Sequence, residues 1–265
     1  MSDYRVHCQP VAVSAAEIHL SPQESHHLVV VNRASAGARV VAFDGHGREW
    51  ETQLVKADKR GARLLIRATH TAPPLPCTIE LAQALPKGTL MDSIVQKATE
   101  LGVRRIHPIL SERSQVHLDG DRRDRKHERW QTSALEAAKQ CGNPWLPEIA
   151  PIADMTAFLG RASTHDLGLI ASLQPEARPL KVVLEKHREH HGRMPERTII
   201  LIGPEGDFSP DELSAAKAAG FQAVTLGPLV LRCETATVAA IAILRHELLS
   251  AKEKEGDLAG SPSGI

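Results

Sequence analysis

The sequence has 265 residues, which suffices for one large domain or for two modest ones with separate apolar cores. Its 32 Lys and Arg side chains balance 32 Asp and Glu side chains. This balance excludes an overall basic field as an argument for nucleic-acid binding, so any such contact must be local. Four widely spaced cysteines without a CxxC pair exclude a zinc ribbon and a disulfide framework, and favour a reducing, cytoplasmic setting. No apolar stretch is long enough for a membrane span, and residues 1–10 lack a signal core.

The first 70 residues carry a β-rich pattern that predicts a small barrel. Strands are expected at residues 29–31, 40–43, 49–55 and 63–67. Asp44-Gly45-His46-Gly47 predicts a hairpin turn, because glycine reaches positive φ without steric cost. A proline cluster at residues 73–76 predicts a linker, since proline continues neither a sheet ladder nor a helix.

From residue 78 onward, strands alternate with helices, which predicts an α/β domain with a mostly parallel sheet. Strands are expected at residues 78–84, 105–110, 167–171, 198–202 and 223–226. Helices are expected at residues 88–101, 125–140, 210–219 and 234–249. His187 and His191 have helical spacing but no third ligand nearby, so we interpret them as exposed and not as a metal site.

Two similar loops follow strands of this domain. Gly203-Pro204-Glu205-Gly206 comes directly after residues 198–202, and Gly227-Pro228 comes directly after Leu226. Either loop alone is typical of a tight turn. Because ligands of α/β proteins bind at the carboxyl edge of the sheet, the pair predicts one shared cleft. A GxGxxG dinucleotide site and a GxxxxGK[ST] phosphate loop are both excluded, because neither pattern occurs.

Motifs throughout the chain resemble the family of ribosomal RNA small subunit methyltransferase E. They are HHL at 26–28 with Arg33, LPKG at 85–88, QKATELGV at 96–103, ERS at 112–114, RW at 129–130, EAAKQCG at 136–142, IGPEG at 202–206, LGP at 226–228 and LRCETA at 231–236.

This resemblance implies a fold and a reaction. The expected fold is a PUA-like RNA-binding β-barrel over residues 1–73 and a SPOUT methyltransferase domain with a deep trefoil knot over 74–250, followed by a tail over 251–265 that is expected to be disordered. The chain is expected to form a homodimer with its active site near the subunit interface. The expected reaction is methylation of a uridine at N3 in 16S ribosomal RNA of the small ribosomal subunit. S-adenosylmethionine is the donor, S-adenosylhomocysteine is the product, and no metal is required.

The resemblance also implies site residues. We expect the cofactor to contact backbone groups of the loops, with Thr235 as a further contact or, alternatively, as the N-cap of the last helix. The backbone candidates are Leu173, Gly203, Gly206, Leu226, Gly227 and Leu231.

Arg232 and Glu205 are the candidate catalytic residues. A guanidinium such as that of Arg232 stabilises negative charge developing on the uracil or orients a phosphate, and the alternative is an ion pair with Glu234. Glu205 is a candidate base or cofactor acceptor, and the alternative is a structural role in its loop. The RNA-binding candidates are Arg5, Arg33, Lys87, Lys97 and Arg113, whereas the basic run at 122–126 is interpreted as a solvated face.

Three positions depart from the family pattern. Asp207 stands where a second glycine is common, Leu229 where a basic residue is common, and Asn143 where arginine is common. Two alternatives therefore stay open. One is a SPOUT methyltransferase that acts on another RNA position, and the other is a ribosome assembly factor without catalysis.

Overall fold

The computed structural model describes residues 4–114, 120–160 and 165–259, and the chain divides into two compact units. The N-terminal unit comprises Met1–Pro74 together with Leu135–Leu146, and the C-terminal unit comprises Leu75–Ala134 with Pro147–Ile265. The sequence predicts a boundary close to the first of these limits. It gives no sign that Leu135–Leu146 belongs to the N-terminal unit.

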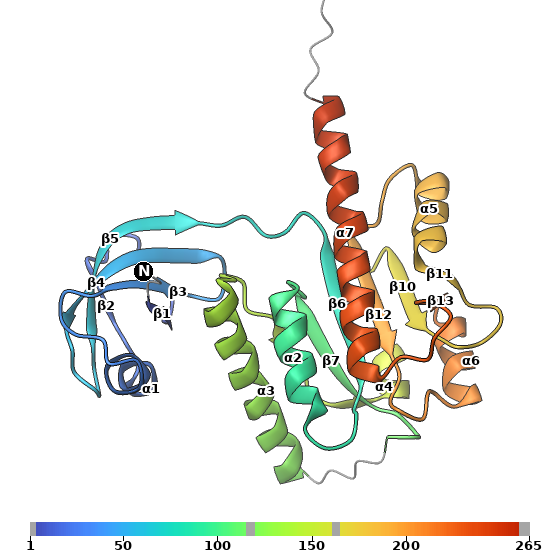
Figure 1. The fold of residues 1–265 in the computed structure, drawn as a ribbon, viewed down its shortest axis with the longest axis horizontal. Coiled ribbons are helices and arrows are strands. Elements are labelled where there is room, and N and C mark those ends of the chain that lie inside the picture. Colours follow the sequence, from blue (N-terminus) through green and yellow to red (C-terminus); the bar gives the residue numbers. More distant parts are fainter. Residues whose placement is uncertain (1–3, 115–119, 161–164, 260–265) are drawn as a thin grey trace, which may run out of the picture. The chain divides into compact units, whose positions relative to one another are not determined.

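A five-stranded sheet forms the N-terminal unit (Figure 1). Its strand order is β1-β3-β4-β5-β2, with β1 parallel to β3 and the other pairs antiparallel. The elements are β1 (Tyr4–His7), β2 (Glu17–His19), α1 (Pro22–His26), η1 (His27–Val31), β3 (Arg39–Phe43), β4 (Arg48–Lys56) and β5 (Arg63–Thr71). Trp50, Leu54 and Leu64 pack with Leu28 in the core of this unit. The expected β-rich domain is confirmed, and β3, β4 and β5 lie where strands are predicted.

The strand predicted at residues 29–31 is wrong, because η1 occupies this segment as a π-helix. Ser21 caps the preceding helix α1 by accepting a hydrogen bond from the backbone N–H of Glu24 at 3.2 Å, and Pro22 fits its first turn. The helical chain continues through Leu28, which is buried, and leaves Val30 and Val31 exposed. A capped helix nucleus here outweighs the β-propensity of three valines.

The predicted turn at residues 44–47 joins β3 to β4 and also contacts the segment Leu135–Leu146. Gly45 and Gly47 have φ of 75° and 91°, and His46 forms an isolated antiparallel bridge with Trp145. A Cβ atom on Gly47 would lie 2.4 Å from the Trp145 ring. Glycine is required at this position for its conformation and for the close approach of the indole.

The C-terminal unit is built on an eight-stranded sheet. Along the order β11-β13-β10-β12-β6-β7-β8, every pairing is parallel, and β9 pairs with β7. The strands are β6 (Thr78–Ala84), β7 (Arg105–Leu110), β8 (Glu148–Ile149), β9 (Ala153–Asp154), β10 (Leu167–Ala171), β11 (Arg178–Pro179), β12 (Arg197–Ile202) and β13 (Gln222–Thr225). The predicted α/β class with a mostly parallel sheet is confirmed.

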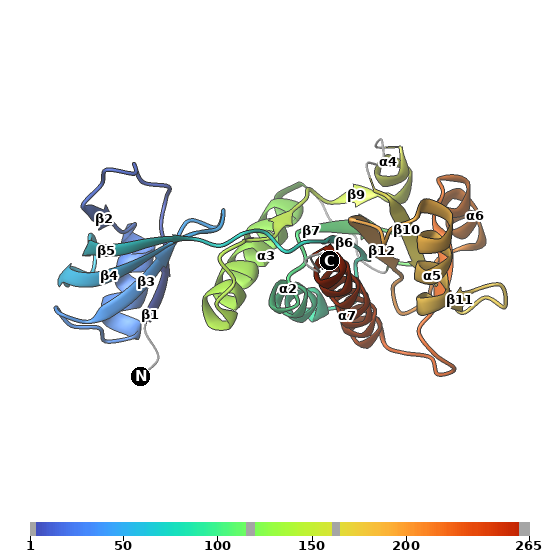
Figure 2. The same cartoon turned by 90° about the horizontal axis from the view of Figure 1, so that it is seen from above.

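Helices cover both faces of this sheet (Figure 2). The helices are α2 (Leu90–Glu100), α3 (Gly120–Cys141), α4 (Met155–Leu159), α5 (Leu180–His191), α6 (Pro210–Ala218) and α7 (Cys233–Ala259). Leu81 and Ile200 face the core shared with α2, α5 and α7, whereas Ala82 and Leu201 face α4 and α6. Both faces of the central strands are buried, which explains their continuous apolar runs.

Three features of this unit differ from the expectations. The sequence did not predict α5, and its His187 is buried where exposure was expected. Burial lowers the pKa of His187, and the neighbouring His191 lowers it further. Helix α7 continues to Ala259, so the tail expected to be disordered from residue 251 is helical to that point, in keeping with its Ala, Lys and Glu content. Residues 260–265 lie outside the described residues.

Candidate functional site

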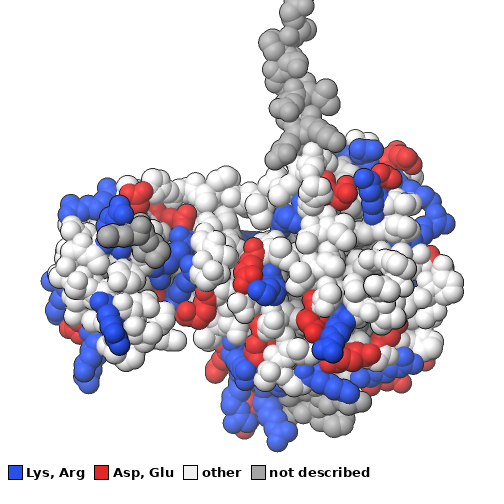
Figure 3. All heavy atoms as spheres, in the orientation of Figure 1, with Lys and Arg blue, Asp and Glu red and all other residues white. Residues whose placement is uncertain are grey.

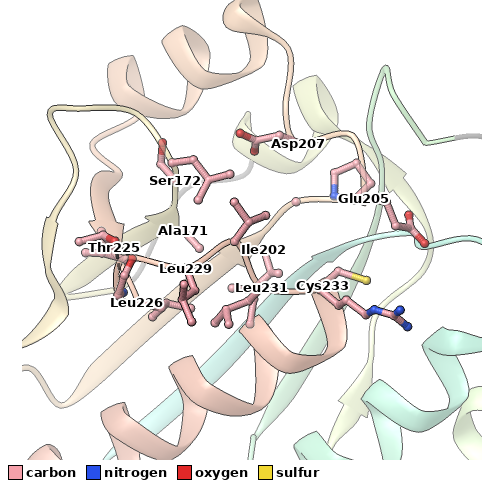
Figure 4. A pocket seen from close by; sticks show the side chains of 18 residues that line it. Ala171, Ser172, Ile202, Glu205, Asp207, Thr225, Leu226, Leu229, Leu231 and Cys233 are labelled. Atoms are coloured by element: carbon pink, nitrogen blue, oxygen red, sulfur yellow. Dashed lines mark hydrogen bonds between the residues drawn. The ribbon is translucent and has the colours of Figure 1, made fainter.

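A cavity of about 290 Å³ lies at the carboxyl ends of β10, β12 and β13. Figure 4 shows Ala171, Ile202 and Leu226, from the ends of these three strands, around one space. The lining residues are Ala171, Ser172, Leu173, Ile202, Gly203, Pro204, Glu205, Asp207, Val224, Thr225, Leu226, Gly227, Leu229, Val230, Leu231, Arg232, Cys233 and Ala236. Both glycine-proline loops thus contribute to one cavity, as their pairing in the sequence predicted.

The loop after β12 is a tight turn closed by a hydrogen bond from the Asp207 N–H to the Pro204 carbonyl at 3.0 Å. Asp207 has φ of 58°, a left-handed conformation that glycine adopts most easily. Its carboxylate accepts a hydrogen bond from the backbone N–H of Phe208 at 2.8 Å, which is the local pairing that lets aspartate tolerate this conformation. The departure at position 207 therefore preserves the glycine-like geometry of the loop.

The start of α6 holds the far end of this loop. The Ser209 hydroxyl accepts a hydrogen bond from the Glu212 N–H, and the Glu212 carboxylate accepts one from the Ser209 N–H, forming a capping box. Pro210 occupies the first turn. These contacts begin α6 in a defined position directly after the loop.

The loop after β13 is shaped by Thr225 and Gly227. The Thr225 hydroxyl donates to the Gly227 carbonyl at 3.0 Å and accepts from the Gly227 N–H at 3.3 Å. Gly227 has φ of 134°, a backbone region that is strained for residues with a side chain. Leu229 and Val230 follow, and they are 73% and 78% exposed at the edge of the cavity.

The first turn of α7 lines the cavity with Cys233 and Ala236. Thr237 is fully buried, and its hydroxyl hydrogen bonds to Gln83 Oε1 at 2.6 Å and to the Cys233 carbonyl at 2.8 Å, which fixes this turn to β6. Burial raises the pKa of the Cys233 thiol to about 12, and the nearby carboxylates of Glu205 and Glu234 add to the effect. Because only the thiolate is a good nucleophile, Cys233 is chemically inert near neutral pH.

The two candidate catalytic residues have different surroundings. Glu205 is exposed, and its Oε1 accepts a hydrogen bond from the backbone N–H of Lys87 at 3.1 Å. Figure 4 shows it at the opposite end of the cavity from Thr225 and Leu226. Arg232 is exposed on the lining, and within the described residues its side chain forms neither a hydrogen bond nor an ion pair. The alternative ion pair between Arg232 and Glu234 is therefore not formed.

Six of the eight expected cofactor residues line the cavity, and Gly206 and Thr235 do not. Gly206 lies beside it and accepts a hydrogen bond from Arg113 through its carbonyl, while Thr235 is exposed on the first turn of α7. The sequence did not name Ala171, Ser172 or Cys233 as site residues. Ala171 and Ser172 have only their place at the end of a strand as a signal, whereas Cys233 belongs to the motif at residues 231–236.

The five RNA-binding candidates lie apart from one another along the chain. In the N-terminal unit, Arg5 is half-buried, pairs with Glu49 at 2.6 Å and stacks over Phe43, whereas Arg33 is exposed. In the C-terminal unit, Lys87, Lys97 and Arg113 are all exposed. Basic and acidic side chains are interspersed on the face drawn in Figure 3, as the charge balance of the chain suggests.

Metal and membrane features can be assessed for the part of the chain that the structure describes. Among residues 4–114, 120–160 and 165–259, no group of three or more His, Cys, Asp or Glu side chains is arranged to hold a metal ion. No helix in the same ranges has an apolar stretch long enough to cross a bilayer.

Comparison with known protein families identifies the chain as a member of the RNA methyltransferases, a class that suits the parallel sheet and its strand-end cavity. The family described as RNA methyltransferase domain matches residues 73–245, and the family described as RNA methyltransferase PUA domain matches residues 20–67. The chain belongs to the family of ribosomal RNA small subunit methyltransferase E. The family assignment made from the sequence motifs is confirmed.

Two relatives with this name support the assignment. The one from Synechocystis sp. is 32% identical over 240 residues, covering 90% of this chain and 76% of the relative. The one from Bacillus subtilis is 30% identical over 241 residues, covering 88% of this chain and 91% of the relative.

Two solved structures have the same fold. A putative methyltransferase from Legionella pneumophila, in complex with the bound cofactor SAM, superposes with a TM-score of 0.84 at 29% identity, covering 93% of this chain and 98% of that one. A ribosomal RNA small subunit methyltransferase E from Neisseria gonorrhoeae, bound to S-adenosyl methionine, gives a TM-score of 0.82 at 29% identity with the same coverage.

Proposed function

We propose that this protein binds S-adenosylmethionine in the strand-end cavity and methylates N3 of a uridine in 16S ribosomal RNA of the small ribosomal subunit. The observation that carries the proposal is the convergence of both glycine-proline loops on one cavity, in a chain whose solved relatives hold this cofactor. Apolar side chains around Ile202 and Leu226, with nearby backbone N–H and C=O groups, are the usual lining of such a site. A cytoplasmic location follows from a ribosomal substrate.

The bound cofactor would supply an activated methyl group on a sulfonium centre. The residues of this chain would bind and orient the reactants and stabilise charge on the uracil. The free guanidinium of Arg232 lies at the cavity, where it is suited to stabilise the negative charge that develops as uridine N3 loses its proton. The Cys233 thiol does not compete for the methyl group, because its raised pKa keeps it protonated.

The proposal includes a trefoil knot in the C-terminal unit and a homodimer, which both come from the family resemblance. Three exposed apolar side chains beside the cavity favour the dimer. Leu173, Leu229 and Val230 are 58%, 73% and 78% exposed, and clustered apolar exposure is typical of a surface that a partner covers.

Calorimetric titration with S-adenosylmethionine tests the cofactor site. Gly227→Ala introduces a side chain at φ 134° in the loop after β13, and Gly220→Ala introduces one at φ 90° after α6, outside the cavity. No atom lies within 4 Å of the added Cβ in either case, so both variants carry backbone strain of about 1–3 kcal/mol without a steric clash.

We expect Gly227→Ala to weaken S-adenosylmethionine binding at least about tenfold, which corresponds to about 1.4 kcal/mol, and Gly220→Ala to leave it unchanged. Equal affinities in the two variants would place the cofactor elsewhere. If the unmodified protein does not bind S-adenosylmethionine, it is neither the proposed uridine methyltransferase nor a SPOUT methyltransferase that acts on another RNA position. That result would favour an assembly factor without catalysis.

A further inference from the structure

The loop after β12 is held from outside by three hydrogen bonds within the C-terminal unit. The Lys87 N–H donates to Glu205 Oε1 at 3.1 Å, and the Arg113 guanidinium donates to the Gly206 carbonyl at 2.9 Å. The Glu112 N–H donates to Glu212 Oε1 at 2.8 Å. Two segments remote in sequence, at Lys87 and at residues 112–113, thus hold the loop at Glu205 and Gly206 and hold the first turn of α6 at Glu212.

The turn that carries Arg113 is itself fixed. The Ser114 hydroxyl hydrogen bonds to the Leu85 carbonyl at 3.2 Å and contacts the Ser111 hydroxyl at 2.9 Å. The Ser114 N–H donates to the Ser111 carbonyl at 2.9 Å, which closes the turn. Arg113 therefore projects from a turn anchored to the end of β6 and meets the loop in a defined position.

The aliphatic stem of Arg113 lies beside Gly206. A Cβ atom added to Gly206 would be 3.5 Å from Arg113 Cβ and 3.7 Å from Cδ, so the stem borders the loop at this glycine. Arg113 does not line the cavity, although Glu205 and Asp207 on either side of Gly206 do. Any effect of Arg113 on the cofactor must therefore act through the loop.

We propose that Arg113 is a positioning residue of the cofactor loop, which holds the Gly206 carbonyl so that Glu205 and Asp207 keep their places on the cavity wall. This inference rests on the proposed cofactor site. It gives Arg113 a role that is present before any RNA binds, in contrast to the RNA contact expected from the sequence.

The test is the dissociation constant of S-adenosylmethionine, measured by calorimetry on RNA-free protein for the unmodified chain and for Arg113→Ala, Arg113→Lys and Arg193→Ala. Arg193 is a matched control, since it is an exposed arginine of the same unit that pairs with Asp166 at 3.4 Å, away from the cavity. Thermal unfolding without ligand is recorded for each variant, so that a general loss of stability is separated from a loss of positioning.

We expect Arg113→Ala to weaken cofactor binding about three- to tenfold, which is the net contribution of one typical hydrogen bond and suits an exposed side chain. Arg113→Lys restores part of the affinity, because an ammonium group can still donate one bond. Arg193→Ala leaves the affinity unchanged. In methylation assays at saturating RNA, the KM for S-adenosylmethionine rises more than kcat falls in Arg113→Ala.

Two results would overturn the inference. If the unmodified protein binds S-adenosylmethionine and Arg113→Ala binds it equally well, the positioning role is wrong while the proposed function stands. If the unmodified protein does not bind S-adenosylmethionine, the proposed function and the positioning role both fail.

Discussion

Charged side chains near the cavity differ in whether they already have a partner. The Glu205 carboxylate accepts the Lys87 N–H, whereas the Arg232 side chain, within the described residues, has no hydrogen-bond or ion-pair partner. A guanidinium held by no protein group is available to a substrate. For this reason we assign charge stabilisation to Arg232 and treat Glu205 first as part of the loop.

Replacing Arg232 tests this assignment. We expect Arg232→Ala to lower the rate of methylation about 100- to 1000-fold, which is typical for removal of one donor that stabilises developing charge. Its affinity for S-adenosylmethionine should remain within about threefold, since the cofactor is proposed to be held mainly by backbone groups and the Arg232 side chain is exposed. Radiolabelled methyl transfer and calorimetry measure the two quantities. An unchanged rate with unchanged affinity would remove Arg232 from the mechanism.

A buried carboxylate outside the cavity gives a pH-dependent prediction. Burial alone would raise the pKa of Glu80, but hydrogen bonds and charge interactions with the imidazoles of His107, at 2.7 Å, and His165, at 3.2 Å, outweigh burial and lower the pKa to about 2. The folded state therefore favours the charged form. Its contribution to stability is full above the ordinary pKa of 4.5 and is lost as the pH falls toward 2.

We expect Glu80→Gln to be less stable than the unmodified protein by about 3 kcal/mol at pH 6, from the lowering of the pKa from 4.5 to about 2. The difference in unfolding free energy between the two proteins should shrink as the pH falls from 5 to 2. Urea unfolding at several pH values measures this difference. A difference that stays constant over that interval would show that the contacts of Glu80 with the two histidines do not stabilise the fold.

At the scale of elements, the last turns of α3 belong to the N-terminal unit through one buried ion pair. Lys139 Nζ lies 2.5 Å from Glu24 Oε1 and 2.9 Å from Glu136 Oε1, and the other Glu24 oxygen accepts the His7 N–H at 3.1 Å. Lys139 and Glu24 are both buried. Removing one partner leaves an uncompensated buried charge, which is more damaging than removing both.

Lys139→Ala should therefore destabilise the protein by about 3–5 kcal/mol, and the double variant Lys139→Ala with Glu24→Gln by clearly less. Lys97→Ala is the control, because Lys97 pairs with Glu100 at the surface and should contribute at most about 0.5 kcal/mol. Urea unfolding provides all three values. A single variant no less stable than the double variant would argue against a stabilising role of this pair.

The sequence predicts elements best where their signal is local. The bounds of β6, β7 and β10 coincide with the predicted strands, because turn residues flank their short apolar runs. The strand prediction at residues 29–31 was wrong because the capped helix that precedes these residues determines their conformation. The place of Leu135–Leu146 in the N-terminal unit depends on contacts such as Lys139 with Glu24, which have no signal in the local pattern.

In the candidate site too, features with a local sequence signal could be predicted, and contacts between residues remote in sequence could not. Both glycine-proline loops were predicted, since each contains its own signal after a strand. The bond between Lys87 and Glu205 joins residues 118 positions apart, and Arg113 and Gly206 are 93 apart. Such contacts follow from the order of strands in the sheet, which periodicity does not reveal. The sequence could therefore name Arg113 from its motif but could not assign it to the cofactor loop.

For the whole molecule, zero net charge constrains how an RNA is recognised. With 32 basic and 32 acidic side chains, binding depends on a few local contacts and on the fit of the site. Arg5 is a weaker candidate than Arg33, because it already pairs with Glu49. The specificity for one uridine that we propose therefore has to come from the site where the methyl group would be transferred.

The most direct measurement is the identity of the nucleoside that the purified protein produces. Small ribosomal subunits from cells without this methylation are incubated with the protein and with isotopically labelled S-adenosylmethionine, and their RNA is digested and analysed by mass spectrometry. The account predicts label in N3-methyluridine at one position of 16S ribosomal RNA, and none with Arg232→Ala on the same timescale. Label in another nucleoside, or no label from a protein that binds the cofactor, would contradict it.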